Sequence, residues 1–378
     1  MLDYRHLSRM DFRVIPVLFA LICISLLVIS AYTVDSNIDG SEESFFTPMV
    51  QKQLQFFFLG SFFFIFFTLF DYNKLREMIW ILYPLMLLSL FGLFFTDSIQ
   101  SVQRWYRIPF IGFNFQPSEC AKLIVVMTLS WFLERRKSHS QTWNTAFFGS
   151  LIVLIPFILI LKQPDLGTAL VLFPITLVMF YFGDLNPTVV RWMTILGGIV
   201  VICVALIFLE VISHETLRPY ASNVLKDYQF ERLNPKTHHQ KAAAIAIAVG
   251  GLTGTGWRNS EFTGGGWLPA AYTDSVFPAF GEQFGFIGLF LLLVLYYALL
   301  YFSFQVTAVA KDHFGRLLSA GITVYLAMHI LVNMGMMIGF FPITGVPLVL
   351  VTYGGSSILA TMIALGILQS IYSRRFMF

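Results

Sequence analysis

Long apolar stretches alternate with short polar connections along most of this 378-residue chain. Ten stretches approach or reach the length that a helix needs to cross about 30 Å of hydrocarbon. They cover residues 14–34, 54–70, 78–96, 118–133, 146–161, 166–183, 190–211, 276–304, 317–341 and 346–372. The pattern predicts an all-α polytopic membrane protein with about ten transmembrane helices.

Composition supports this class. The chain is 57% hydrophobic and 12% charged, holds 41 Phe and has a mean hydropathy of +0.74, which excludes a soluble globular protein. The net charge is only +3 and no long Lys/Arg block occurs, so a nucleic-acid partner is not expected. The first apolar stretch follows Arg13 without a small-residue cleavage site, which predicts a retained signal anchor. We therefore expect one integral membrane domain over residues 1–378.

The basic residues assign the two sides of the membrane, because Lys and Arg accumulate in short cytoplasmic loops. Thirteen of them fall on the side that holds both termini, and four fall in the other short loops. The thirteen are Arg5, Arg9, Arg13, Lys74, Arg76, Arg135, Arg136, Lys137, Arg191, Lys311, Arg316, Arg374 and Arg375; the four are Lys52, Arg104, Arg107 and Lys162. The count predicts cytoplasmic termini in a cytoplasmic (inner) membrane protein.

This topology places the long segment 212–275, between the seventh and eighth spans, outside the cell. Its apolar part, residues 242–252, is too short to span, so we expect it at the membrane interface or dipping in and returning. Residues 250–267, GGLTGTGWRNSEFTGGGW, offer turns and close backbone approach. They lack the ending of a phosphate-binding loop, which favours a mobile loop.

An acid stands where this outer segment meets the eighth span. Asp274 lies between Pro269 and Pro278, Thr273 can cap the following helix, and Glu282 lies two turns further in. An unpaired acid costs about 2–3 kcal/mol at the centre of a membrane helix, and less at the boundary. Asp274 therefore either caps the helix or lies in a polar site with a function.

Further polar residues flank other spans. Glu119 and Lys122 follow Pro117 and Ser118 and are three residues apart, hence on one helix face, where they form either a structural ion pair or part of a site.

Two outer loops hold the remaining candidates. Arg104, beside Trp105, is either a headgroup anchor or a phosphate ligand with a planar donor fork. Asp165, after Pro164, is either an ordinary helix N-cap or a substrate contact.

Other patterns carry less chemistry. Residues 339–357 are uncharged and rich in Gly and Pro, which predicts a broken helix between the ninth and tenth spans. His238 and His239 are adjacent, a spacing that does not converge on one metal ion. No nucleophile elbow of a hydrolase occurs, and the cysteines lie in apolar runs that predict no disulfide. These cysteines are Cys23, Cys120 and Cys203.

Several motifs together resemble a known family. They are Arg104-Trp105, QPSE with Lys122, QPDLGT at residues 163–168, LP with Thr273-Asp274, GFIG at 285–288, PITGVPL, and YGGSS. In this order, over essentially the whole chain, they are similar to the SEDS proteins (shape, elongation, division and sporulation), which include RodA and FtsW. The short tails and the N-terminal sequence resemble the RodA type more closely.

The resemblance implies a peptidoglycan glycosyltransferase that polymerises lipid II on the outer face of the cytoplasmic membrane during cell elongation and shape maintenance. Asp274 would be the general base that activates the acceptor sugar hydroxyl. The residues implied to contact substrate are Arg104, Trp105, Glu119, Lys122, Asp165 and Glu282. The resemblance also implies a divalent cation, Mg²⁺ or Mn²⁺, with unknown ligands, which with Arg104 and Lys122 would stabilise the leaving pyrophosphate.

The implied partners are lipid II (an undecaprenyl-linked disaccharide peptide), a class B penicillin-binding protein, the elongation machinery and membrane lipids. Three other functions stay open: a lipid II flippase, an FtsW-like division enzyme, and a non-catalytic scaffold for a penicillin-binding protein. Buried charges and broken helices also occur along transport routes, although no inverted repeat is visible here.

The chain departs from the usual family pattern at several positions, which affects substrate and metal contacts more than the role of Asp274. The departures are Thr255, Ala270, Tyr272, Ser275, Gln283, Val349 and Thr352, together with the stretch around 236–241. They indicate a divergent member, with an altered wall substrate or partner.

Overall fold

The computed structural model describes residues 8–32, 45–96, 103–108, 113–221, 230–235 and 237–376. Three positions used above, Arg5, Val34 at the end of the first expected span, and Lys236, lie outside these ranges. Within them the chain is mostly helical, as expected.

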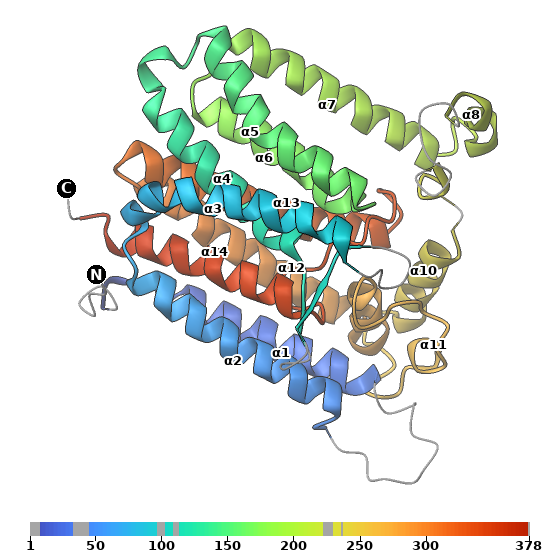
Figure 1. Ribbon diagram of the computed structural model, residues 1–378. Coiled ribbons are helices and arrows are strands. Elements are labelled where there is room, and N and C mark those ends of the chain that lie inside the picture. Colours follow the sequence, from blue (N-terminus) through green and yellow to red (C-terminus); the bar gives the residue numbers. More distant parts are fainter. Residues whose placement is uncertain are drawn as a thin grey trace.

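Each of the ten expected spans overlaps a long helix (Figure 1). These are α1 (Val14–Tyr32), α2 (Pro48–Leu69), α3 (Leu75–Gly92, extended by η3, Leu93–Phe95), α4 (Pro117–Arg135), α5 (Trp143–Lys162), α6 (Leu166–Phe182), α7 (Pro187–Phe208), α12 (Val276–Val309), α13 (His313–Met337) and α14 (Gly355–Ser373). Eight helices in the described ranges are long and apolar enough to cross a membrane, namely all of these except α4 and the shorter α6. The protein is therefore a multi-pass membrane protein.

Side-chain caps and prolines set where several helices begin. Thr142 accepts a hydrogen bond from Thr145 N at 3.4 Å, and Asp312 accepts one from Gly315 N at 3.0 Å. Proline occupies the first turn of α2, α4 and α7, where its missing N–H leaves no bond unmade.

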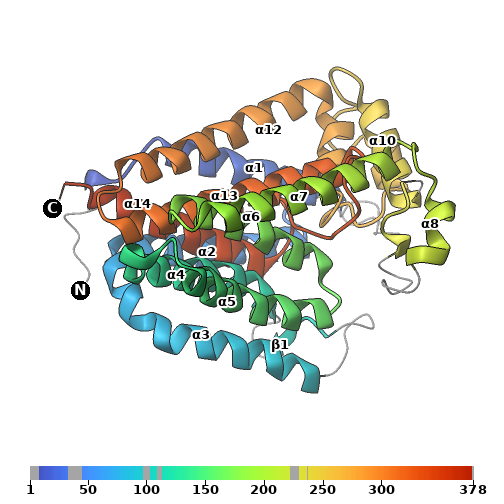
Figure 2. The same ribbon diagram turned by 90° about the horizontal axis from the view of Figure 1, so that it is seen from above.

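The helices differ in how much of their surface faces the bundle. In the apolar windows of α13 and α14, 72% and 78% of the residues are buried, against 6% in α7. Figure 1 and Figure 2 accordingly show α13 and α14 within the bundle and α7 at its edge. α14 packs against α2, while α13 packs against α12, α4 and α6. The two most enclosed helices are thus the ones that flank the break described below.

The described segments nearest the two termini lie at the same end of the bundle (Figure 1). The opposite end holds α8 (His214–Ala221), α10 (His238–Gly250) and α11 (Glu261–Gly264). β1 (Tyr106–Ile108) and β2 (Phe113–Phe115) pair in antiparallel fashion, with Tyr106 opposite Phe115. The expected interfacial stretch 242–252 falls largely within α10, which packs against α12.

The chain between α13 and α14 is not helical over residues 338–354. We call residues 342–354 the GP loop. The break expected from the Gly and Pro residues is confirmed, but the prediction that the last helical run begins at Val346 is wrong, because α14 begins at Gly355. Partners inside the bundle stabilise the loop backbone: Tyr296 donates to Val349 O at 2.7 Å. Such irregular backbone at membrane depth requires protein partners.

α12 contains a second break, at Gly285, where φ is 62° and ψ is −164°. Backbone atoms of the glycine-rich segment fill the missing hydrogen bonds: Phe286 N donates to Gly251 O at 2.9 Å, and Thr255 N donates to Glu282 O at 2.9 Å. The segment predicted to be a mobile loop is thus hydrogen-bonded to the interrupted helix on both sides of its break.

Replacing Gly285 by alanine should destabilise the protein. Its φ and ψ lie in a region essentially restricted to glycine, where another residue costs about 1–3 kcal/mol. A Cβ would also lie 2.4 Å from Gly254 N. Thermal unfolding in detergent measures the effect, with Gly198→Ala as the control, since an added Cβ there meets nothing within 4 Å. Equal melting temperatures for the two variants would contradict this account of the break.

Candidate functional site

Asp274 lies in the turn that precedes α12. The N-cap of that helix is Ser275, without a capping side-chain bond, so neither Asp274 nor Thr273 caps it as the sequence allowed. The turn is closed by two bonds to Ala270 O, from Thr273 N at 3.0 Å and from Ser275 N at 3.1 Å. The Asp274 carboxylate is therefore not consumed by a helix cap.

The GP loop lies directly against this turn. Tyr353 N donates to Tyr272 O at 2.9 Å, and Thr352 Oγ1 donates to Thr273 O at 3.2 Å. A Cβ built on Gly345 would lie 3.7 Å from Asp274 Oδ2. Two segments about 80 residues apart in sequence, both irregular, thus form the immediate surroundings of Asp274.

Asn333, on α13, joins the same two segments. Its Nδ2 donates to Asp274 O at 3.2 Å and to Val346 O at 2.8 Å. The side chain is fully buried. One amide group therefore fixes the backbone of the Asp274 turn relative to the GP loop.

The electrostatic environment of Asp274 combines burial with positive charge. Burial raises the pKa of the Asp274 carboxyl above its usual value, because it penalises the charged form. The guanidinium groups of Arg232 and Arg104 oppose this rise. Sequence reasoning missed Arg232, which lies in the outer segment without any motif around it; only its charge was available as a signal.

The guanidinium fork of Arg104 is turned toward the backbone. Its Nε donates to Gln163 O at 3.1 Å, and its Nη2 donates to Pro164 O. Trp105 beside it is partly buried. Arg104 therefore anchors the connection that leads into α6 while its charge still acts on Asp274.

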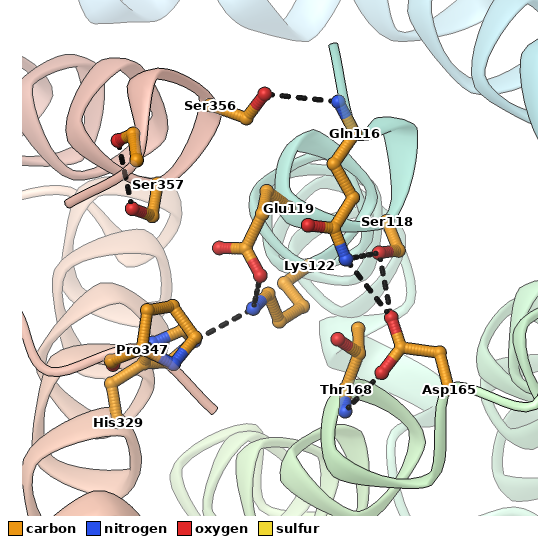
Figure 3. Close-up of polar contacts among 11 residues, drawn as sticks. Gln116, Ser118, Glu119, Lys122, Asp165, Thr168, His329, Pro347, Ser356 and Ser357 are labelled. Atoms are coloured by element: carbon orange, nitrogen blue, oxygen red, sulfur yellow. Dashed lines mark hydrogen bonds and ion pairs between the residues drawn. The ribbon is translucent and has the colours of Figure 1, made fainter. Parts of the chain in front are cut away.

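Asp165 is the N-cap of α6 and accepts a hydrogen bond from Thr168 N at 3.2 Å, which confirms the capping alternative. Its second oxygen accepts bonds from Ser118 Oγ at 3.0 Å and Gln116 Nε2 at 3.2 Å (Figure 3). The carboxylate thus joins the start of α6 to the start of α4. In the first turn of α6, Gly167 packs closely on the GP loop, where a Cβ would meet Thr344 O at 2.6 Å.

Glu119 and Lys122 form a buried ion pair on one face of α4. Lys122 Nζ lies 2.7 Å from Glu119 Oε1, and the two side chains are 0% and 2% exposed. Lys122 Nζ also lies 2.7 Å from Nε2 of His329, whose Nδ1 lies 3.2 Å from Pro347 O in the GP loop (Figure 3). The expected pairing is confirmed, and His329 is a third member that the sequence did not indicate.

Glu282 lies apart from these groups. Its carboxylate accepts hydrogen bonds from Phe262 N at 2.8 Å and Thr263 N at 2.9 Å, and another from Thr263 Oγ1. These donors lie in the first turn of α11. The structure therefore uses Glu282 to hold the outer segment against α12.

Two departures from the family pattern contact each other, and a third, Tyr272, contacts two other tyrosines. The Ser275 hydroxyl lies 2.6 Å from Nε2 of His239. The ring centroid of Tyr272 lies 4.9 Å from that of Tyr32 and 5.9 Å from that of Tyr353. Among the described residues, no group of three or more His, Cys, Asp or Glu side chains could hold a metal ion, so His239 packs against the Asp274 turn without forming such a site.

The chain matches a family of known proteins. A family model described as cell cycle protein, covering FtsW, RodA and SpoVE, matches residues 12–375. The peptidoglycan glycosyltransferase MrdB of Escherichia coli K12 is 32% identical over 286 residues, 73% of this chain and 72% of that protein. The probable peptidoglycan glycosyltransferase FtsW of Geobacter metallireducens is 28% identical over 385 residues, 99% and 97% of the two chains.

Solved structures share the fold over nearly the whole chain. A chain from work on structural coordination of polymerization and crosslinking by a peptidoglycan synthase complex superposes with a TM-score of 0.75 and 25% identity, covering 97% of this chain and 98% of that one. The rod shape determining protein RodA of Thermus thermophilus gives a TM-score of 0.69 at 23% identity, with the same coverage.

Replacing Asp165 by alanine should lower stability by about 0.5–2 kcal/mol, the usual weight of a lost N-cap. Asp165→Asn isolates the cap, because its amide oxygen can still accept from Thr168 N while its amide nitrogen, like alanine, cannot accept from Ser118 or Gln116. Thermal unfolding of both variants in detergent measures the difference. If the alanine variant were no less stable than the asparagine variant, the capping role would be wrong.

Proposed function

Because the chain belongs to the FtsW, RodA and SpoVE family of cell cycle proteins, we propose that it is a peptidoglycan glycosyltransferase that polymerises lipid II during cell elongation. Curated relatives that carry the name peptidoglycan glycosyltransferase support the activity. The observation that carries the proposal within this chain is the Asp274 carboxylate, which is left out of the helix cap and lies near two guanidinium groups.

Asp274 acts as the general base. It takes the proton from the acceptor GlcNAc hydroxyl while that oxygen forms a bond to the anomeric carbon of the donor. The bond from that carbon to the undecaprenyl pyrophosphate breaks, and the pyrophosphate leaves with the bonding electrons. The raised pKa suits the role, because a base whose pKa lies nearer the working pH accepts a proton more readily.

Positive charge stabilises the leaving group. The electrostatic effect of Arg104 and Arg232 on Asp274 supports this role for their charges. In this proposal Trp105 lies beside Arg104 at the substrate entrance, while Glu119, Lys122 and Asp165 shape the floor of the site. Their contacts support that assignment: Asp165 joins α4 to α6, and Lys122 contacts the GP loop through His329. Glu282 contributes by holding the outer segment.

The divalent cation implied by the resemblance, Mg²⁺ or Mn²⁺, does not fit the described side chains as a resident ion, because no group of three possible ligands occurs among them. An ion carried in by the substrate remains part of the proposal, since Mg²⁺ commonly binds through one or two carboxylates together with substrate phosphates. No step given above depends on it.

The proposed topology has ten spans in the inner membrane, cytoplasmic termini and residues 212–275 as an outer segment of a single membrane domain, 1–378. The ten long helices and the position of α8, α10 and α11 at the end opposite the termini support it (Figure 1). The proposed partner is a class B penicillin-binding protein of the elongation machinery. A fold relative that belongs to a complex for polymerization and crosslinking supports such a pairing.

Asp274→Asn should lower lipid II polymerisation by about 10²–10⁴-fold, the usual contribution of a general base. The measurement uses the purified protein with its penicillin-binding partner, whose own activity is disabled. Glu261→Gln, an exposed acid in the same outer segment, is the control and should retain activity. Full polymerisation by Asp274→Asn would mean that another residue is the general base. Translocation of lipid II without polymer formation would favour a flippase.

The pH dependence of polymerisation should depend on the guanidinium group of Arg232, through its effect on the pKa of Asp274. A base must be deprotonated to act, so activity falls as the pH drops through the pKa of Asp274. Because Arg232 lowers that pKa, Arg232→Gln should move the acid limb of the rate profile to higher pH. Arg218→Gln, at an exposed position of α8, should leave the limb in place. If the acid limb of the rate profile did not move in Arg232→Gln, the group that titrates there would not be Asp274.

A further inference from the structure

His329 bridges α4 and the GP loop. Its Nε2 lies 2.7 Å from Lys122 Nζ on α4, and its Nδ1 lies 3.2 Å from Pro347 O in the GP loop (Figure 3). The residue is 2% exposed and sits in the middle of α13. Both ring nitrogens are therefore used, in a place without access to bulk water.

The partners fix which nitrogen carries the hydrogen. The Pro347 carbonyl can only accept, so Nδ1 of His329 donates to it. The Lys122 ammonium can only donate, so Nε2 of His329 accepts from it. Lys122 donates a second N–H to Glu119 Oε1 at 2.7 Å. A directed series of hydrogen bonds thus runs from the buried ion pair through the imidazole to the GP loop.

The same loop defines the surroundings of Asp274. Pro347 lies two residues beyond Gly345, whose backbone passes against the Asp274 carboxylate. Val346, between them, accepts a hydrogen bond from Asn333 at 2.8 Å. His329 and Asn333 are four residues apart and so share one face of α13. That face holds the GP loop at two consecutive carbonyls, and Asn333 holds the Asp274 turn as well.

From this geometry we propose that His329 is a positioning residue, which ties Lys122 to the Pro347 carbonyl and so holds the GP loop in place against Asp274. The part that concerns catalysis rests on the proposed function of Asp274. The imidazole ring suits the role for two reasons. Its two nitrogens point in different directions, so they can bond to two partners, and the rigid ring has little conformational freedom to lose. The GP loop is then held, through His329, by the buried Glu119–Lys122 ion pair of α4.

Two substitutions separate the two contacts. In His329→Asn the amide stands where Nδ1 stood, so it can still donate to Pro347 O but cannot reach Lys122. In His329→Gln the amide stands where Nε2 stood, so it can still accept from Lys122 but loses Pro347. His329→Leu loses both. His313→Asn, at the far end of the same helix, is the matched control.

Amide hydrogen exchange of the purified protein without substrate reports the loop directly. Leu348 N bonds to Thr352 Oγ1 at 2.8 Å, and Tyr353 N bonds to Tyr272 O at 2.9 Å, so both amides report on the loop. We expect exchange there to rise about tenfold in His329→Gln and His329→Leu, the effect of one buried hydrogen bond. His329→Asn should exchange more slowly than His329→Gln, and His313→Asn should match the wild type. Unchanged exchange in both Gln and Leu variants would overturn the proposal.

Polymerisation kinetics then test the link to Asp274. In His329→Gln we expect kcat to fall by about tenfold with little change in KM, because substrate binding groups stay in place while the carboxylate loses its fixed surroundings. Partial rescue in His329→Asn would support positioning through Pro347. Loop exchange is measured without turnover, so it decides the positioning role even if Asp274→Asn proves fully active and the function proposal fails. Faster exchange with unchanged kcat would overturn the catalytic link.

Discussion

Inside a membrane every backbone polar group and every charge needs a partner from the protein, and this constraint governs the structure around Asp274. The GP loop interrupts the bundle between its two most enclosed helices, where water cannot satisfy its carbonyls. Side chains from two helices supply the partners: Tyr296 of α12 contacts Val349, and Asn333 and His329 of α13 contact Val346 and Pro347. An irregular segment at this depth can therefore be ordered as well as a helix.

The same constraint explains why the acids fall into two groups. Asp165 and Glu282 use both carboxylate oxygens on protein donors, and Glu119 uses Oε1 on the Lys122 ammonium. Asp274 differs, because in the described part of the chain its carboxylate forms no helix cap or ion pair, while Arg232 and Arg104 act on it electrostatically. A carboxylate left open in this way is the one suited to exchange protons with a bound sugar.

Local pattern was enough to predict the helices, the pairing of Glu119 with Lys122, the cap at Asp165 and the break before α14, because each depends on residues close in sequence. The contact of Lys122 with His329 spans 207 positions, and Glu282 finds its donors 19 and 20 positions away across a turn. Apolar periodicity carries no signal for such pairs. It also misplaced the start of α14, since residues 346–354 are as apolar as a helix although their Gly and Pro neighbours prevent one.

The break at Gly285 divides α12 into two parts that are both attached to the glycine-rich segment. Before the break, Glu282 O accepts a hydrogen bond from Thr255 N, and after it Phe286 N donates one to Gly251 O. A displacement of the glycine-rich segment would therefore act on both parts of α12, including the outer part that begins directly after the Asp274 turn. The two parts of α12 are thus joined twice, through the chain at Gly285 and through the outer segment that bonds to both.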